Sequence, residues 1–333
     1  MYIIENYGIA VLFTIITMLC WGSWGNTQKF VAKSWRFELF YWDYVIGILI
    51  FSLVFGLTLG SNGNNGRSFI PDIIQADSEN IVKAIIGGII FNASNILLVA
   101  AMALAGMAVA FPVGVGIALV LGVLVNYISN PLGNALLLFS GVAFIGVAII
   151  VDAIAYRKNS ASKKKVSSKG ILFSLAAGVL MSFFYFFVAK SMFADFKNPE
   201  AGKLSPYSAL FLFAVGIFLS NFIFNTLFMR KPVEGNPVSY SDYFKGNFKS
   251  HLTGIFGGFI WMLGMSMSII ASGKAGFAIS YGLGQGATLV AAFWGVFIWK
   301  EFKGASKQVN TLITIMFLAY IIGLSLIIIA GLN

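Results

Sequence analysis

Cysteine, histidine and charged residues are all scarce in this sequence of 333 residues, and each scarcity excludes a class of protein. Cys20 is the single cysteine and His251 the single histidine, which excludes a disulfide framework and a histidine-rich metal site. No carboxylate lies at the centre of an apolar run, and no His-Glu-x-x-His pattern occurs. Without a nucleophile–base pair or paired acids, we expect neither an enzyme nor a bound metal or organic cofactor.

The small share of charged residues, 10%, indicates an integral membrane protein, because soluble domains carry roughly a quarter. Hydrophobic residues make up 59% of the chain, and the mean hydropathy is +0.88. The apolar runs that can cross about 30 Å of hydrocarbon are continuous, which predicts an all-α membrane protein with ten transmembrane helices rather than a barrel. The predicted spans are 5–27, 40–60, 82–104, 107–127, 134–156, 169–191, 207–229, 252–272, 275–298 and 310–331.

One pattern occurs twice in the chain, at residues 105–120 and, 170 positions later, at 275–290. Glycine-interrupted apolar segments at matching places in two halves are typical of a transporter's binding site. Each half holds five spans, an odd number, so the second must enter the membrane from the opposite side. This predicts a 5+5 inverted repeat, with a first repeat at 1–156, a basic linker at 157–168 and a second repeat at 169–333. The shared positions include Gly106/Gly276, Gly114/Gly284 and Gly116/Gly286, and the same offset pairs Gly87-Gly88 with Gly257-Gly258.

Lysine and arginine are distributed unevenly between the two sides of the membrane. The connections after odd-numbered spans carry 16 of the 22 basic residues, and residues 157–169 are the richest stretch. The positive-inside rule therefore predicts a cytoplasmic linker and both termini outside, in a cell (inner) membrane. Orientation and contact with anionic lipid account for the net charge of +10, so no nucleic-acid partner is expected. The oligomeric state stays open, with a homodimer among the alternatives.

Several short motifs stand mainly in the first half of the chain. They are Met-Tyr-Ile-Ile-Glu-Asn at 1–6, Trp-Gly-Ser-Trp-Gly-Asn-Thr at 21–27, Tyr-Trp-Asp-Tyr at 41–44, Gly87-Gly88, and a small-residue fourth helix that ends in Asn126-Tyr127. These motifs resemble the ureide permease family, which is similar to bacterial glucose/ribose and rhamnose porters within the drug/metabolite transporter superfamily. The resemblance covers the first 155 residues by motif and the second half by architecture. It implies ten helices in a five-plus-five inverted repeat and proton-linked uptake of small nutrients such as allantoin, uracil or sugars.

The central linker departs from the pattern of this family. Plant ureide permeases carry a longer central loop with a nucleotide-binding-like motif. Residues 157–169 contain no Gly-x-x-x-x-Gly-Lys-Ser/Thr, so we expect no ATP binding. The expected energy source is a proton gradient.

The fourth and ninth predicted helices offer the first candidates for a solute site. Pro112 removes a backbone donor and frees a carbonyl about one turn earlier, and Gly282–Gly286 expose backbone in the ninth helix, so we expect both helices to be broken at these positions. In a membrane such groups need partners from other helices, from water or from a ligand. Tyr281 and Gln285 add a polar stripe at helical spacing. Close packing of helices through small residues is the alternative.

Carboxamides and aromatic rings are the next candidates. Asn92 and Asn95 share one face of the third helix, where they can bind amide or hydroxyl groups or join helices to each other. Flat rings stack on heterocycles and sugars, but they also form interfacial belts. The candidate rings, with a carboxamide that follows one of them, are Trp24, Asn26, Tyr185 and Trp261.

Ion coupling requires a group that changes charge or coordinates a cation. Glu5, Asp43 and Asp152 are the acids inside or at the margins of the predicted helices. Each can instead form an interfacial salt bridge or a helix cap. If none of them couples, transport is facilitated diffusion. His251 is expected in the loop before the eighth helix.

These observations predict a secondary transporter that imports a small neutral polar solute by alternating access, coupled to protons. The solute is expected near mid-depth between helices 1, 3, 4, 6, 8 and 9. Ureides, nucleobases and sugars all suit a site of carboxamides, hydroxyls and aromatic rings, so the solute stays open. The alternatives are a drug or metabolite exporter of the same fold, and a structural or receptor-like membrane protein without transport activity.

Overall fold

The computed structural model describes residues 1–31, 35–63, 65–159 and 167–332, and within them the protein is all-α, with no sheet. Ten helices of this described part are long and apolar enough to cross a membrane, which confirms the predicted spans. Two short helices, α3 (Phe69–Gln75) and α9 (Tyr240–Phe244), lie in connections and were not predicted. The spanning elements are α1 (Tyr7–Ser23) with η1 (Trp24–Phe30), α2 (Phe37–Leu57), α4 (Ser78–Ala105), α5 (Met107–Ser129), α6 (Ala135–Asn159), α7 (Ser168–Ser191), α8 (Pro206–Arg230), α10 (Phe248–Ala275), α11 (Phe277–Gly284) with α12 (Ala287–Phe293) and η2 (Trp294–Ile298), and α13 (Lys307–Ala330).

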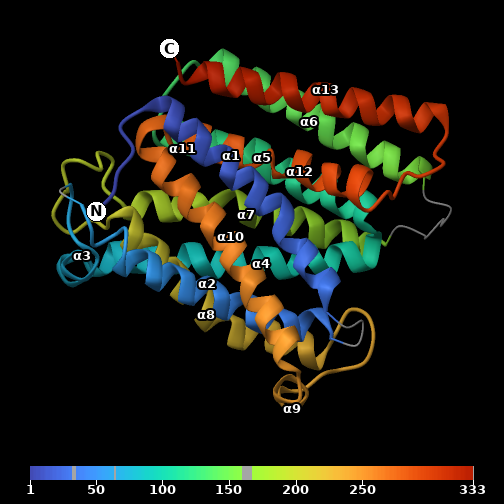
Figure 1. The fold of residues 1–333 in the computed structure, drawn as a ribbon, viewed down its shortest axis with the longest axis horizontal. Helices are drawn as coiled ribbons and strands as arrows, with labels where there is room; N and C mark the ends of the chain where they lie inside the picture. The colour runs from blue at the N-terminus through green and yellow to red at the C-terminus, as the bar shows by residue number, and fades with distance from the viewer. Residues whose placement is uncertain (32–34, 64, 160–166, 333) are drawn as a thin grey trace.

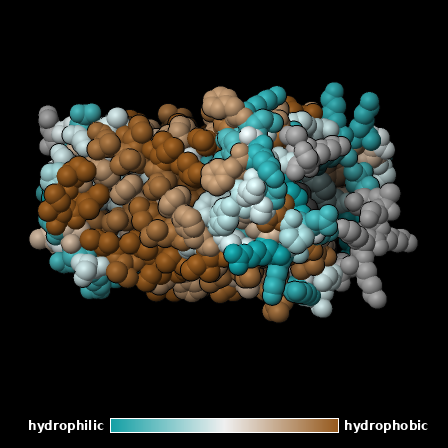
Figure 2. Space-filling view, turned by 90° about the horizontal axis from the view of Figure 1, so that it is seen from below, coloured by the Kyte–Doolittle hydropathy of each residue, from teal (hydrophilic) through white to brown (hydrophobic). Residues whose placement is uncertain are grey.

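The helices run along the long axis of the bundle between two ends of different character (Figure 1). We call the end at which α6 ends and α7 begins the linker end, and the opposite end, which carries both chain termini, the terminal end. A broad hydrophobic band covers one face of the bundle, and hydrophilic side chains gather towards the linker end (Figure 2). On α8 the exposed apolar residues include Leu219, Phe222, Ile223 and Leu227. Such a band is expected where side chains contact lipid.

Two long helices end in the same way at positions 170 residues apart. Helices α4 and α10 each contain 28 residues, and each ends at a glycine with positive φ, 81° at Gly106 and 84° at Gly276. With ψ near 150°, this backbone conformation is essentially restricted to glycine. The glycines therefore end one span and allow the next to begin at once, which explains why the repeated pattern contains them.

A close helix contact also occurs twice, between α2 and α10 and between α8 and α4. A Cβ atom built on Gly258 would overlap the backbone oxygen of Tyr44, and one built on Gly88 would overlap that of Phe213. In each contact the second helix of one half packs on the third helix of the other half, α2 on α10 and α8 on α4. The inverted repeat remains a prediction, and this duplicated contact supports it.

Three local expectations can be compared with the helix bounds. The ninth span is broken as predicted, because α11 ends at Gly284 and α12 begins at Ala287. The expected break at Pro112 is wrong, since α5 continues through the proline. The loop assignment of His251 is also wrong: α10 begins at Phe248, three residues before the histidine, with an Asn247 cap. The apolar run at 252–272 predicts only the part of α10 that lies in the membrane, and the helix extends beyond both ends of that run.

Candidate solute cavity

A cavity of about 410 Å³ lies between the halves of the bundle. Its described wall comes from α1 and η1, α4, α5, α7, α10, and α12 with η2, the helices between which the solute is expected, and also from α2 and α6. Lining residues towards the linker end, such as Lys29 and Glu301, are exposed, whereas Phe91, Asn95 and Trp261 are buried. The cavity therefore opens at the linker end and ends blindly inside the bundle.

Four aromatic rings line the inner end of the cavity, and the Phe213 ring packs behind them. The Trp261 ring lies at the centre of this cluster, 4.3 Å from Phe91 and 5.9 Å from Trp21 between ring centroids. Phe184 contacts Phe91 at 5.2 Å, and Phe213 stacks on Trp261 at 6.1 Å. We call these five rings the aromatic floor. It separates the cavity from the terminal end and offers flat surfaces to a planar solute.

Two carboxamides line the cavity together with the aromatic floor. Asn95 donates from Nδ2 to the Tyr41 hydroxyl, 3.1 Å away, and no donor to its Oδ1 is found in the described residues. The Gln285 side chain lies in the turn between α11 and α12, is 8% exposed, and makes no hydrogen bond within the described part of the chain. Nearly buried amides need partners, so both groups are available to a polar solute.

Charged residues of the described cavity wall lie towards the linker end. The Tyr156 hydroxyl donates to Glu301 at 2.7 Å, and the Lys29 ammonium lies 3.6 Å from the same carboxylate. Asp152 lines the wall one turn before Tyr156 and interacts with the charge of Glu301. Glu301 was missed, because it follows the ninth span in a connection that shows no periodicity.

Six predicted solute-site residues line the cavity, and three do not. Trp24, Asn26, Asn95, Pro112, Trp261 and Gln285 are in the wall. Asn92, Tyr185 and Tyr281 are fully buried, and each joins helices. The Asn92 amide accepts from the Tyr41 hydroxyl at 2.9 Å and donates to Ser220 at 2.9 Å. The Tyr185 hydroxyl meets Ser268, and that of Tyr281 donates to the Ala118 carbonyl at 3.1 Å.

The three predicted coupling acids lie in different places. Asp152 is in the cavity wall. Glu5 precedes α1 on the surface of the terminal end, where Lys197, 2.7 Å away, lowers the pKa of its carboxyl group. Asp43 is buried in the second turn of α2, away from the cavity wall, and its carboxylate accepts hydrogen bonds from Tyr243 and His251.

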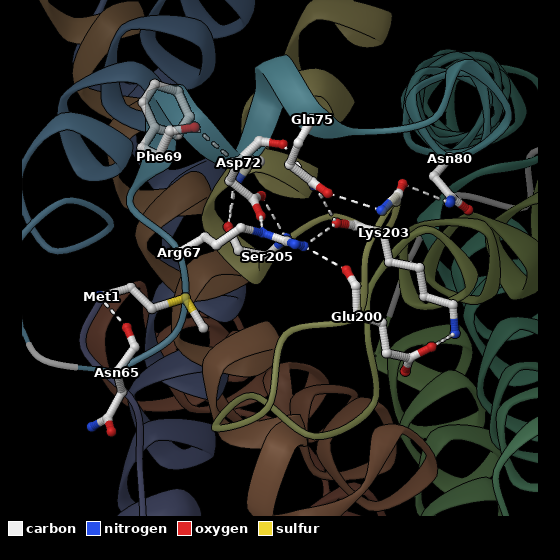
Figure 3. Close-up of polar contacts among 12 residues, drawn as sticks. Met1, Asn65, Arg67, Phe69, Asp72, Gln75, Asn80, Glu200, Lys203 and Ser205 are labelled. Atoms are coloured by element: carbon white, nitrogen blue, oxygen red, sulfur yellow. Dashed lines mark hydrogen bonds and ion pairs between the residues drawn. The ribbon is translucent and has the colours of Figure 1, made fainter.

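A polar network closes the terminal end (Figure 3). The carboxylate of Asp72, which is fully buried, accepts from Arg67 Nε at 3.0 Å and from the Ser205 backbone amide at 2.7 Å. Arg67 and Gln75 both donate to the Lys203 carbonyl, each at 2.9 Å. The connection between α2 and α4 is thus bound to the connection between α7 and α8. At the cavity opening, hydrogen bonds from Tyr156 and Asn159 to Glu301 and from Trp299 to Asn26 join α6 and η1 to the connection that follows η2.

Comparisons with known proteins agree with this architecture. The family model for ureide permeases matches residues 40–171 and 165–330, so the match includes the second half, where the sequence motifs were weak. Ureide permease 1 of Arabidopsis thaliana is 23% identical, with 98% of each chain covered, and ureide permease 2 is 23% identical over 96% of each. A crystal structure of a protein with 15% identity superposes with a TM-score of 0.60, covering 94% of this chain and 95% of that one.

Proposed function

The chain belongs to the ureide permease family, and we propose that it carries a small neutral solute of the ureide class across the membrane. The observation behind this proposal is that the aromatic floor and two carboxamides with unsatisfied hydrogen-bonding groups, Asn95 and Gln285, line one cavity. Ureides contain a flat urea group with N–H donors and a carbonyl acceptor. A carboxamide matches both, and a ring surface packs against the flat face.

The distribution of charge in the cavity favours a neutral solute. Lys29, Asp152 and Glu301 are the charged residues among the described lining residues, and they lie on the side of the opening. Around the aromatic floor the described lining is apolar or uncharged. A charged solute would lose hydration there without gaining an opposite charge, which is costly.

Two features support alternating access and import. The cavity opens at the linker end while the network around Asp72 holds the terminal end shut. Because the positive-inside rule places the linker in the cytoplasm of a cell membrane, this conformation is inward-facing. Import then requires the reverse state, in which the aromatic floor opens towards the terminal end. We include proton coupling in the proposal as the energy source.

Uptake into proteoliposomes tests this function. Radiolabelled allantoin, uracil, glucose and rhamnose are compared with and without an inward proton gradient, and we expect gradient-stimulated allantoin uptake. A hydrogen bond is worth about 0.5–1.5 kcal/mol, so Gln285→Ala should weaken apparent affinity by about 2–10-fold. Gln308→Ala makes the same truncation on the exposed surface of α13 and serves as the matched control.

Each outcome bears on a different part of the proposal. Failure of wild-type protein to take up any of the four solutes would contradict import and favour an exporter of the same fold. Uptake of a sugar but not allantoin would contradict the solute class. Equal affinities for Gln285→Ala and Gln308→Ala would remove this cavity as the binding site.

A further inference from the structure

Asp43 and His251 form an isolated titratable pair at the linker end, outside the solute cavity. The Asp43 Oδ1 atom lies 2.9 Å from His251 Nδ1 and accepts a hydrogen bond from the Tyr243 hydroxyl at 2.6 Å. The residue is 1% exposed, and its Oδ2 atom is buried without a partner among the described residues. Together with Tyr243, the pair joins three elements, since Asp43 belongs to α2, Tyr243 to α9 and His251 to α10.

His251 is the one basic side chain within ion-pair distance of this carboxyl group in the described part of the chain. Nearby charges are otherwise engaged: Arg36 and Glu38 pair with each other, and Asp242 accepts from Ser239 to cap α9. The remaining neighbour, Trp35, presents an uncharged ring, with its centroid 5.1 Å from that of His251. Among the described residues, no lysine or arginine thus neutralises Asp43.

Charge balance at this pair depends on one proton. With that proton, the pair is neutral overall, either as a carboxylate with an imidazolium or as a carboxylic acid with an imidazole. Without it, a buried carboxylate with an orphan oxygen faces a neutral ring, which is an unfavourable arrangement in a desolvated site. The pocket is therefore built to hold a single exchangeable proton between two side chains.

The pair has access to the same side as the solute cavity. The His251 side chain is 24% exposed at the linker end, whereas Asp43 is sealed behind it. In this conformation a proton can leave through His251 to the compartment into which the cavity opens. A symporter must release proton and solute to the same side from one conformation, and this geometry satisfies that requirement.

Helix α10 connects the pair to the solute cavity. Positions 251, 254, 258 and 261 lie on one face of the helix, at spacings of three and four. A Cβ atom on Gly254 would overlap Asp43, and one on Gly258 would overlap the Tyr44 carbonyl, so this face lies directly on α2. The same face ends at Trp261, the central ring of the aromatic floor. A change in how α10 sits on α2 must therefore move the floor.

We propose that Asp43 and His251 together bind the co-transported proton, and that loss of this proton at the linker end loosens α10 from α2 and resets the transporter. This assignment rests on the proposed function. It also sets Asp152, which lies in the cavity wall, and Glu5, which is exposed at the terminal end, outside the coupling mechanism.

The single histidine allows a direct measurement on the unmodified protein. In protein labelled with 15N-histidine, every ring nitrogen signal comes from His251. Because binding of solute and proton is reciprocal in a symporter, saturating allantoin at fixed pH should add the proton to the pair and shift this signal, since the ring either becomes an imidazolium or faces a carboxylic acid in place of a carboxylate. A signal that does not respond to bound allantoin would overturn the assignment.

Transport by variants gives the second test. Asp43→Asn and His251→Asn should lose gradient-driven accumulation of allantoin but still exchange it across the membrane without a gradient. Glu79→Gln, which alters an exposed acid paired with Lys83, is the control and should accumulate allantoin normally. If both variants accumulate like wild type, or if Asp152→Asn alone loses coupling, the assignment is wrong while the proposed function stands. If wild-type exchange occurs without any response to a gradient, proton coupling itself is refuted.

Discussion

Alanine substitution at the duplicated helix contact gives the sharpest test of the architecture. In Gly88→Ala the new methyl group overlaps the Phe213 carbonyl oxygen, and in Gly258→Ala it overlaps that of Tyr44. Backbone oxygens inside packed helices cannot rotate away, so the helices must separate. Overpacking of this kind costs about 1–3 kcal/mol, and a backbone obstacle places both variants near the upper value. A loss of about 3 kcal/mol lowers the folding equilibrium constant by about 100-fold.

The control for this prediction lies in the same chain. A Cβ atom built on Gly146 of α6 would meet no atom of another helix within 4 Å. Gly146→Ala should therefore be neutral or slightly stabilising. Unfolding of purified protein by increasing SDS in mixed micelles compares the three variants. We expect nearly equal losses for Gly88→Ala and Gly258→Ala, because their contacts correspond. Tolerance of alanine at either position, to the level of Gly146→Ala, would refute both the close approach and the argument from repetition.

Three further predictions concern polar contacts. Asn92→Ala should destabilise the fold by about 1–3 kcal/mol because it leaves buried partners unsatisfied, whereas Gln285→Ala should unfold like wild type in the same SDS titration. Asp72→Asn should speed hydrogen exchange in residues 58–77, since it removes the charge that holds the terminal end closed; unchanged exchange contradicts this role. Lys197 lowers the pKa of the Glu5 carboxyl group. The ion pair is therefore fully formed at pH values above the ordinary glutamate pKa, and it is lost as the pH falls through the lowered pKa. The carboxylate is fully exposed, and Glu5→Gln should therefore leave thermal stability and uptake unchanged.

The sequence predicted those parts of the fold that depend on composition and local periodicity. Ten apolar runs predicted ten spans, because the length needed to cross hydrocarbon is fixed. The break around Gln285 followed from clustered glycines. The same reasoning failed at Pro112, where α5 continues through the proline. A proline frees a carbonyl but does not determine whether tertiary packing keeps the helix intact.

The site was only partly predictable, since many of its contacts join residues far apart in the chain. Carboxamides and rings could be proposed, but the sequence did not separate Gln285, which faces the cavity, from Asn92, which joins helices. The pairing of Asp43 with His251 spans 208 positions and depends on α10 beginning earlier than its apolar run. Glu301 gave no signal at all, because its position at the opening is set by the fold alone.

The two copies of the repeated motif have different shapes in one molecule. The first copy lies in the continuous helix α5, and the second is divided into α11 and α12. In the inverted repeat that we propose, exchanging the two shapes would produce a bundle related to this one by a two-fold rotation about an axis in the membrane plane, with its opening at the terminal end. On that proposal the two copies represent the two conformations of one hinge, and threading each half through the backbone of the other gives a structure for the opposite state.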